Sequence, residues 1–177
     1  MNINSDSAAI RYPSGSAIID QLKKAEVQFI VSVPDIVTSN GLLWPISEDP
    51  DFKLVRVCKE DEGVSICGAM SYNNTRALLL MQQTGLMDSL NAIRAIGMDY
   101  QLPVCMMVGL QGKEPERAAV DSDSYGVNII EPVLQAMQIS YKVIEQPEDV
   151  DTIADELSHA YQTSSTVILI LGREPTK

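Results

Sequence analysis

Six short strand-like runs, most of them apolar, recur along the chain, and a helix-like segment separates each run from the next. The runs are rich in Val, Ile, Leu and Met, which is typical of buried strands. They span residues 29–33, 53–58, 76–82, 103–109, 140–145 and 166–171. Since parallel strands need long crossovers, this alternation predicts a mostly parallel sheet with helices on both faces. We expect one three-layer α/β domain over residues 15–177, preceded by a polar segment, 1–14.

The intervening segments predict the helices and some of their boundaries. They cover residues 14–27, 36–46, 62–73, 86–97, 127–138 and 149–162. Ser14 or Ser16 can cap the first helix. We expect Pro45 to break the second helix and Gly97 to close the fourth as a C-cap. Pro132 has to lie in the first turn of its helix or kink it.

Composition and charge exclude several classes of partner. Aliphatic side chains must build the core, because 45% of the residues are hydrophobic and only 5% are aromatic. The formal net charge of −11 disfavours nucleic acid and anionic membranes as partners. The chain has no apolar run long enough to span a membrane, and its polar start lacks the core of a signal peptide. We therefore expect a cytoplasmic protein.

The cysteines and the single histidine indicate neither a disulfide framework nor a metal site. The three cysteines form no CxxC pair. Cys67 and Cys105 lie in apolar segments and are expected in the core. His159 is expected on the surface of an amphipathic helix, and a lone histidine makes a zinc site improbable.

In a parallel sheet, ligands bind at the carboxyl ends of the strands. Four such ends carry polar or turn-forming residues, namely 33–35, 58–62, 82–85 and 109–112. No GxGxxG follows the first strand, and no GxxxxGK[ST] occurs. The common phosphate-binding fingerprints are therefore missing from this chain.

Glu62 is the first candidate at these ends, and two interpretations of it remain open. Together with Glu60 and Asp61 it can simply favour the helix dipole, by about 0.3–1 kcal/mol each. The small residues that follow, Gly63 and Gly68 among them, instead suggest close packing and a functional carboxylate, because glycine costs about 1 kcal/mol within a helix.

The other strand ends offer weaker candidates. Gln83 and Thr84 follow a buried strand, and their donors and acceptors suit a ligand, although Thr84 can also serve as a helix cap. Asp35 follows Pro34 and can cap the next helix. Gln111 lies between glycines in a loop whose composition is typical of a mobile segment.

Taken in order, these pieces resemble the pyrimidine-binding domain of thiamine-diphosphate enzymes, in particular the phosphonopyruvate and sulfopyruvate decarboxylases. The matching text is VPD (33–35), EG (62–63), MQQTGLMDSLNAI (81–93) and GLQG (109–112). The likeness covers roughly residues 15–172, and the combination of motifs is more specific than any one of them. It implies thiamine-diphosphate chemistry on a 2-oxo acid.

The resemblance also implies roles for individual residues. Glu62 matches the glutamate that hydrogen-bonds a ring nitrogen of the cofactor's aminopyrimidine and favours its imino tautomer. Asp35 would face the reacting carbonyl and assist proton transfer. Gln83, Thr84 and Gly85 would line the cofactor, and Asp35, Gln83 and Gln111 would contact the substrate. Glu60 and Asp61 match no essential position.

Single-chain members of this family bind magnesium and the diphosphate in a second domain that has a GDG motif, and this sequence has no GDG. The resemblance therefore implies the α subunit of a split decarboxylase. A β subunit would hold thiamine diphosphate and Mg²⁺ by the diphosphate, in an assembly of two α and two β chains or larger.

Departures from the family pattern bear on the substrate. Gln111 stands where the phosphonate and sulfonate enzymes have arginine, and Gly126-Val127 replaces a further GR. Because arginine forks recognise such dianions, a phosphonate or sulfonate substrate is not expected. Two alternatives remain open: a carboligase or synthase that uses the same cofactor, and a non-catalytic assembly partner.

Overall fold

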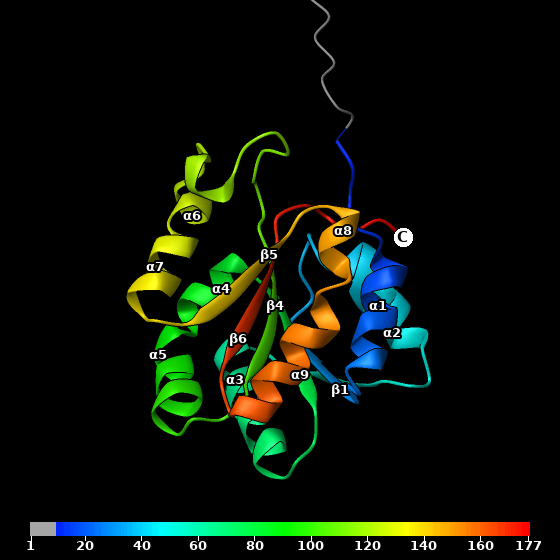
Figure 1. Cartoon of the computed structure of the whole chain (residues 1–177), viewed down its shortest axis with the longest axis vertical. Coiled ribbons are helices and arrows are strands. Elements are labelled where there is room, and N and C mark those ends of the chain that lie inside the picture. The colour runs from blue at the N-terminus through cyan, green and yellow to red at the C-terminus, as the bar shows by residue number, and fades with distance from the viewer. Residues whose placement is uncertain (1–9) are drawn as a thin grey trace, which may run out of the picture.

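The computed structural model describes residues 10–177 and confirms the α/β architecture, with one six-stranded sheet between two layers of helices (Figure 1). The strands are β1 (Phe29–Ser32), β2 (Lys53–Arg56), β3 (Ala77–Gln82), β4 (Cys105–Gly109), β5 (Ser140–Ile144) and β6 (Val167–Leu171). Their order is β2-β1-β3-β4-β6-β5, and every neighbouring pair is parallel. Most of the segment 1–14 lies outside the described residues, so the proposed domain boundary stays a prediction.

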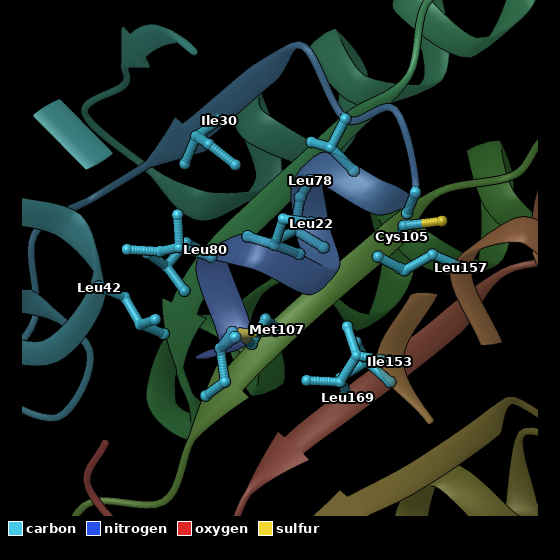
Figure 2. Close-up of a cluster of buried hydrophobic side chains, with 14 of the residues drawn as sticks. Leu22, Ile30, Leu42, Leu78, Leu80, Cys105, Met107, Ile153, Leu157 and Leu169 are labelled. Atoms are coloured by element: carbon cyan, nitrogen blue, oxygen red, sulfur yellow. The ribbon is translucent and has the colours of Figure 1, made fainter. Parts of the chain in front are cut away.

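One face of the sheet is covered by elements from both ends of the chain. They are α1 (Gly15–Lys24), η1 (Ser39–Leu43), α2 (Trp44–Glu48), α8 (Pro147–Val150) and α9 (Ile153–Thr163). Figure 2 shows side chains of this layer, among them Leu22 and Leu157, which pack against Leu78 and Met107 of the central strands.

The central part of the chain covers the opposite face. Its elements are α3 (Glu60–Tyr72), α4 (Gln83–Asp88), α5 (Leu90–Ala92), η2 (Ile93–Asp99), η3 (Ala119–Asp121), α6 (Tyr125–Asn128) and α7 (Ile130–Ala136). Successive residues of a strand point to opposite faces, so Leu79 and Met106 pack on this layer, while their neighbours Leu78 and Met107 pack on the first. Both faces of β1, β3, β4 and β6 are buried, which explains why these strands are almost continuously apolar, whereas the edge strands β2 and β5 are partly exposed and carry charged residues.

Two predicted helix boundaries are wrong. Pro45 does not end its helix, because η1 passes directly into α2 one residue before the proline, so the helix changes from π to α type there and continues. Gly97 is not a C-cap. It lies inside η2, and a Cβ there would overlap the side chain of Thr166. Pro132 lies in the first turn of α7, and Ser14 caps α1 by accepting the N–H of Ala17 at 3.3 Å.

The other core and surface predictions hold for the described residues. Cys67 and Cys105 are buried, and burial raises the pKa of the Cys105 thiol to about 12. Cys58 and His159 are exposed. Within residues 10–177, no helix is both long and apolar enough to cross a membrane.

The two ends of the described chain are joined to each other. The N–H of Gly15 donates to the carbonyl of Thr176 at 2.8 Å, and the N–H of Thr176 donates to the carbonyl of Pro13 at 3.0 Å. Gly41 lies against Pro175 so closely that a Cβ would overlap the proline carbonyl. Three backbone segments therefore meet without intervening side chains.

Candidate active site at the carboxyl edge of the sheet

The chain leaves β1 and β3 toward opposite faces of the sheet. After β1 it enters η1 on the first face, and after β3 it enters α4 on the second. Neighbouring strands whose connections diverge in this way leave a crevice at their carboxyl ends, where open α/β folds bind ligands. Asp35 follows β1 and Gln83 follows β3, so two of the predicted site residues border this crevice.

Glu62 lies in the first turn of α3, and the backbone orients its side chain. Its Oε2 atom accepts the N–H of Cys58 at 3.0 Å and that of Lys59 at 3.3 Å, the second of which is one half of a capping box. Its Oε1 atom has no hydrogen-bond partner within residues 10–177, and the residue is exposed. The carboxylate is thus held in place by one oxygen while the other remains available to a ligand.

The glycines of α3 contribute to packing within the chain. A Cβ on Gly63 would overlap Leu79 of β3, and one on Gly68 would overlap Ile96 of η2. These glycines let α3 lie close to the sheet and to η2, which supplies the packing reason that the sequence suggested. They carry no further information about Glu62.

Glu60 lies at the same edge of the sheet and faces a hollow, although it was predicted only as a helix-terminus acid. Its side chain lies against Gly85, where a Cβ would overlap the carboxyl group. Together with Gln83 and Thr84 it lines a hollow of about 350 Å³, the β3 hollow, which is completed by Met87, Asp88 and Gly126. The glycine after Thr84 was the available signal, because a missing side chain leaves room for a neighbour.

Asp35 forms a turn with the residues that follow it. Its Oδ1 accepts the N–H groups of Val37 and Thr38, both at 2.8 Å, and its Oδ2 accepts the hydroxyl of Thr38. This is the capping arrangement that the sequence analysis left open as an alternative. The predicted catalytic role of Asp35 is not tested by this geometry and stays a prediction.

Gln83 joins two strand ends. Its amide nitrogen donates to the carbonyl of Gln111 at 2.8 Å, and its amide oxygen accepts the N–H of Gln111 at 2.8 Å. The side chain is 4% exposed, so both polar atoms are used inside the protein. The neighbouring Thr84 is exposed and accepts a hydrogen bond from the amide of Gln82 at 2.6 Å.

Gln111 is exposed at a second hollow of about 330 Å³, the β1–β4 hollow. Its wall consists of Tyr12, Ile36, Val37, Leu110, Gln111, Gly112, Lys113, Pro115, Gly172, Arg173 and Glu174. The pair formed by Gln83 and Gln111 connects the two hollows, because Gln83 lines one and Gln111 the other. Tyr12 and Ile36 were not predicted as site residues, and no motif marks them.

The loop after β4 is held by two cations, while its predicted mobility stays a prediction. The Lys113 ammonium group is 1% exposed, pairs with Glu145 at 2.7 Å and donates to the carbonyls of Glu114 and Arg117. The Arg173 guanidinium makes four hydrogen bonds to backbone carbonyls, two of them to Pro115. The loop is therefore anchored at several points. Within residues 10–177, no cluster of three or more His, Cys, Asp or Glu side chains is arranged to hold a metal ion.

Solved structures share this fold. Benzoylformate decarboxylase from Polynucleobacter necessarius superposes with a TM-score of 0.66 at 16% identity, over 92% of this chain and 30% of that one. A 2-oxoglutarate:ferredoxin oxidoreductase from Magnetococcus marinus gives 0.66 at 12% identity, over 91% of this chain and 29% of that one. The chain thus has the fold of a segment that makes up about a third of these larger enzymes.

Curated relatives narrow the resemblance, while no family model matches the chain. The sulfopyruvate decarboxylase subunit alpha of Methanocaldococcus jannaschii is 29% identical over 87% of this chain and 90% of its own length. The protein of the same name from Methanothermobacter thermautotrophicus is 25% identical over 92% and 97%. A sulfopyruvate decarboxylase of Methanosarcina acetivorans is 24% identical, and this chain spans 39% of it. Over most of its length the chain is similar to α subunits of sulfopyruvate decarboxylase, as the motifs indicated.

Proposed function

We propose that the chain is the α subunit of a cytoplasmic, two-chain, thiamine-diphosphate-dependent decarboxylase of 2-oxo acids. The observation that carries the proposal is the Glu62 carboxylate, which two backbone N–H groups hold at the carboxyl edge of the sheet. The similarity to subunits named for a decarboxylase supports the same reaction class.

Glu62 fits the aminopyrimidine of thiamine diphosphate. A ring nitrogen that shares a proton needs one acceptor at a fixed position, and the unpartnered Oε1 of Glu62 offers it. Thiamine diphosphate supplies a carbon nucleophile and an electron sink for decarboxylation. Glu62 would hold and share the proton at that nitrogen. Gln83, Thr84 and Gly85 would flank the ring from the β3 hollow, to whose wall Glu62 does not contribute. Asp35 would remain close to the substrate carbonyl.

A partner subunit completes the proposed site. Glu62 is exposed in this chain. Hydrogen bonds and charges that assist proton transfer act more strongly in a site that excludes water, so another surface would have to cover Glu62. The relatives carry the name subunit alpha, which supports a second kind of chain. We propose that this β subunit covers Glu62 and holds the diphosphate and Mg²⁺, in an assembly with at least two copies of each chain.

The substrate is proposed to be neither a phosphonate nor a sulfonate. Gln111 supplies an amide where such a dianion would need a guanidinium fork, and Val127 stands at the position of the second arginine. The two cations beside Gln111 are engaged, Lys113 with Glu145 and backbone, and Arg173 with backbone carbonyls.

The test begins with the complex as it exists in the cell. The tagged chain is purified from its host, and the intact assembly is weighed by native mass spectrometry. A partner chain with thiamine diphosphate and Mg²⁺ retained supports the proposal, and CO₂ release is then measured for a panel of 2-oxo acids. An assembly without cofactor, or one that releases a hydroxyketone instead of an aldehyde, contradicts the decarboxylase assignment.

The Glu62→Gln variant assigns the role of the carboxylate. Its amide oxygen can still accept the two backbone N–H groups, so the start of α3 should survive while proton sharing is lost. General acid–base contributions of this kind amount to about 10²–10⁴-fold, so kcat should fall at least a hundredfold. Asp61→Asn is the matched control, because Asp61 lies in the same turn and bonds only to its own neighbours, the N–H of Glu62 and the side chain of Lys59. Equal activity of Glu62→Gln and Asp61→Asn would remove Glu62 from the mechanism.

A further inference from the structure

We propose that the β1–β4 hollow binds the side chain of the substrate and that this side chain is apolar and uncharged. The inference deepens the proposed function and rests on it for the reacting end of the molecule. The class of side chain follows from the size, lining and charges of the hollow.

The hollow has the size and position of a small-molecule site. Its volume of about 330 Å³ is at the lower end of the range for ligand pockets, roughly 300–1,000 Å³, which suits a small metabolite. It opens at the carboxyl ends of β1, β4 and β6, and Ile36 in its wall directly follows Asp35. Asp35 itself is not part of the wall, so we place the reacting carbonyl near Asp35 and the other end of the ligand in this hollow.

Apolar side chains supply much of the wall. Ile36 is 66% exposed and Tyr12 is 41% exposed, although both are large hydrophobic residues, while Val37 and Leu110 are buried behind them. Pro115 adds a further apolar surface. Leaving Ile36 and Tyr12 in water forgoes hydrophobic stabilisation that a bound apolar group would restore.

The charges at the hollow do not suit an anion. The three ammonium hydrogens of Lys113 are matched by the Glu145 carboxylate and two backbone carbonyls. Arg173 uses four of its five N–H groups on carbonyls of the chain. Glu174 is exposed at the same wall and repels a negative group. An anionic side chain would thus meet the Glu174 carboxylate and two cations whose N–H groups are mostly used within the chain, whereas an alkyl side chain meets matching surface.

Binding to the full chain tests the inference independently of turnover. The probes are 4-methyl-2-oxopentanoate, which has a branched alkyl side chain, and 3-sulfopyruvate, which has an anionic one. Two-dimensional NMR of the ¹⁵N-labelled chain should show saturable shifts at the amide of Gly112, in the hollow, but not at Gly126, in the β3 hollow. The alkyl acid should bind at least about tenfold more tightly than the sulfonate, since a few methylene groups are worth that much.

Ile36→Arg should reverse this preference. Because Ile36 is exposed, the variant is expected to fold, and it places a free guanidinium at the wall of the hollow. The ratio of the two affinities should move at least about tenfold toward 3-sulfopyruvate. Tyr100→Arg is the matched control, because Tyr100 is a 76% exposed aromatic residue that precedes β4 at the opposite edge of the sheet. It adds the same charge and should leave the ratio unchanged.

The outcomes separate the two proposals. Tighter binding of 3-sulfopyruvate, shifts confined to Gly126, absence of binding by either probe, or an unchanged ratio in Ile36→Arg would each overturn the inference. If the alkyl acid binds as expected but no complex of the chain releases CO₂ from any 2-oxo acid, the proposed function fails and the assignment of the hollow stands.

Discussion

Gln83 is predicted to stabilise the carboxyl edge by joining β3 to the loop after β4. In Gln83→Met the side chain keeps its length and approximate volume, so little cavity should form, but both bonds to the Gln111 backbone are lost. A buried neutral hydrogen bond contributes about 1 kcal/mol net, so the variant should lose about 2 kcal/mol of unfolding free energy. For a chain of this length, this loss corresponds to roughly 4–8 °C in the unfolding midpoint.

Gln82→Met is the matched control for this measurement. Gln82 is the adjacent residue of the same type, and its amide makes one side-chain hydrogen bond, to the exposed Thr84. Water can replace that bond, so the change should stay within about 0.5 kcal/mol. Urea unfolding followed by circular dichroism measures both variants, and amide exchange at Gln111 reports the local effect.

The stability of Gln83→Met and the exchange rate at the Gln111 amide test separate contributions of Gln83. If Gln83→Met is as stable as Gln82→Met, the paired bonds contribute nothing and the edge is held by other contacts. If stability falls but exchange at the Gln111 amide does not accelerate, the loss comes from packing of the side chain and not from the connection between the strands.

Three further predictions concern reactivity and backbone conformation. A thiol reagent should label one cysteine, Cys58, in the native chain and three after unfolding, because the other two are buried and burial raises the pKa of Cys105 to about 12; more than one native label would contradict this. Gly41→Ala should cost about 1–3 kcal/mol in urea unfolding, because its methyl group meets a backbone carbonyl, whereas Gly126→Ala, with open space around it, should be nearly neutral; equal effects would refute the overlap. Ser164→Gly should add about 0.5–1 kcal/mol, because Ser164 has a φ of 52° that glycine adopts without strain, and a loss of stability would show that its side chain contributes instead.

The regular part of the fold was predictable because the four inner strands are buried on both faces and are marked by apolar runs. The edge strands β2 and β5 are partly exposed and contain charged residues, but every observed strand still lies within its predicted segment. The helix interruptions were not predictable in the same way. Pro45 was predicted to break its helix because the sequence does not show which turn of the helix the proline occupies. Gly97 was predicted as a C-cap because the sequence does not show that Thr166 packs against it.

The position of a candidate residue was predictable where its contacts lie within a few residues along the chain. The position of Glu62 before a glycine at the start of a helix already identified an acid at the carboxyl edge. Pairings between distant residues left no local signal, so neither the bonds from Gln83 to Gln111 nor the contact of Glu60 with Gly85 could be inferred. Tyr12 and Ile36 reach one hollow from separate segments, which only the fold brings together.

The strand order has a consequence for how the chain can fold. β6 is the last strand in the sequence, yet it lies between β4 and β5 in the sheet. Until residues Val167–Leu171 are made, β4 has an unpaired apolar edge and β5 lacks the neighbour that joins it to the sheet. Such contacts between distant segments form slowly, and an open parallel edge invites wrong pairing. Completion of the last strand should therefore coincide with the step at which the nascent chain stops being prone to aggregate.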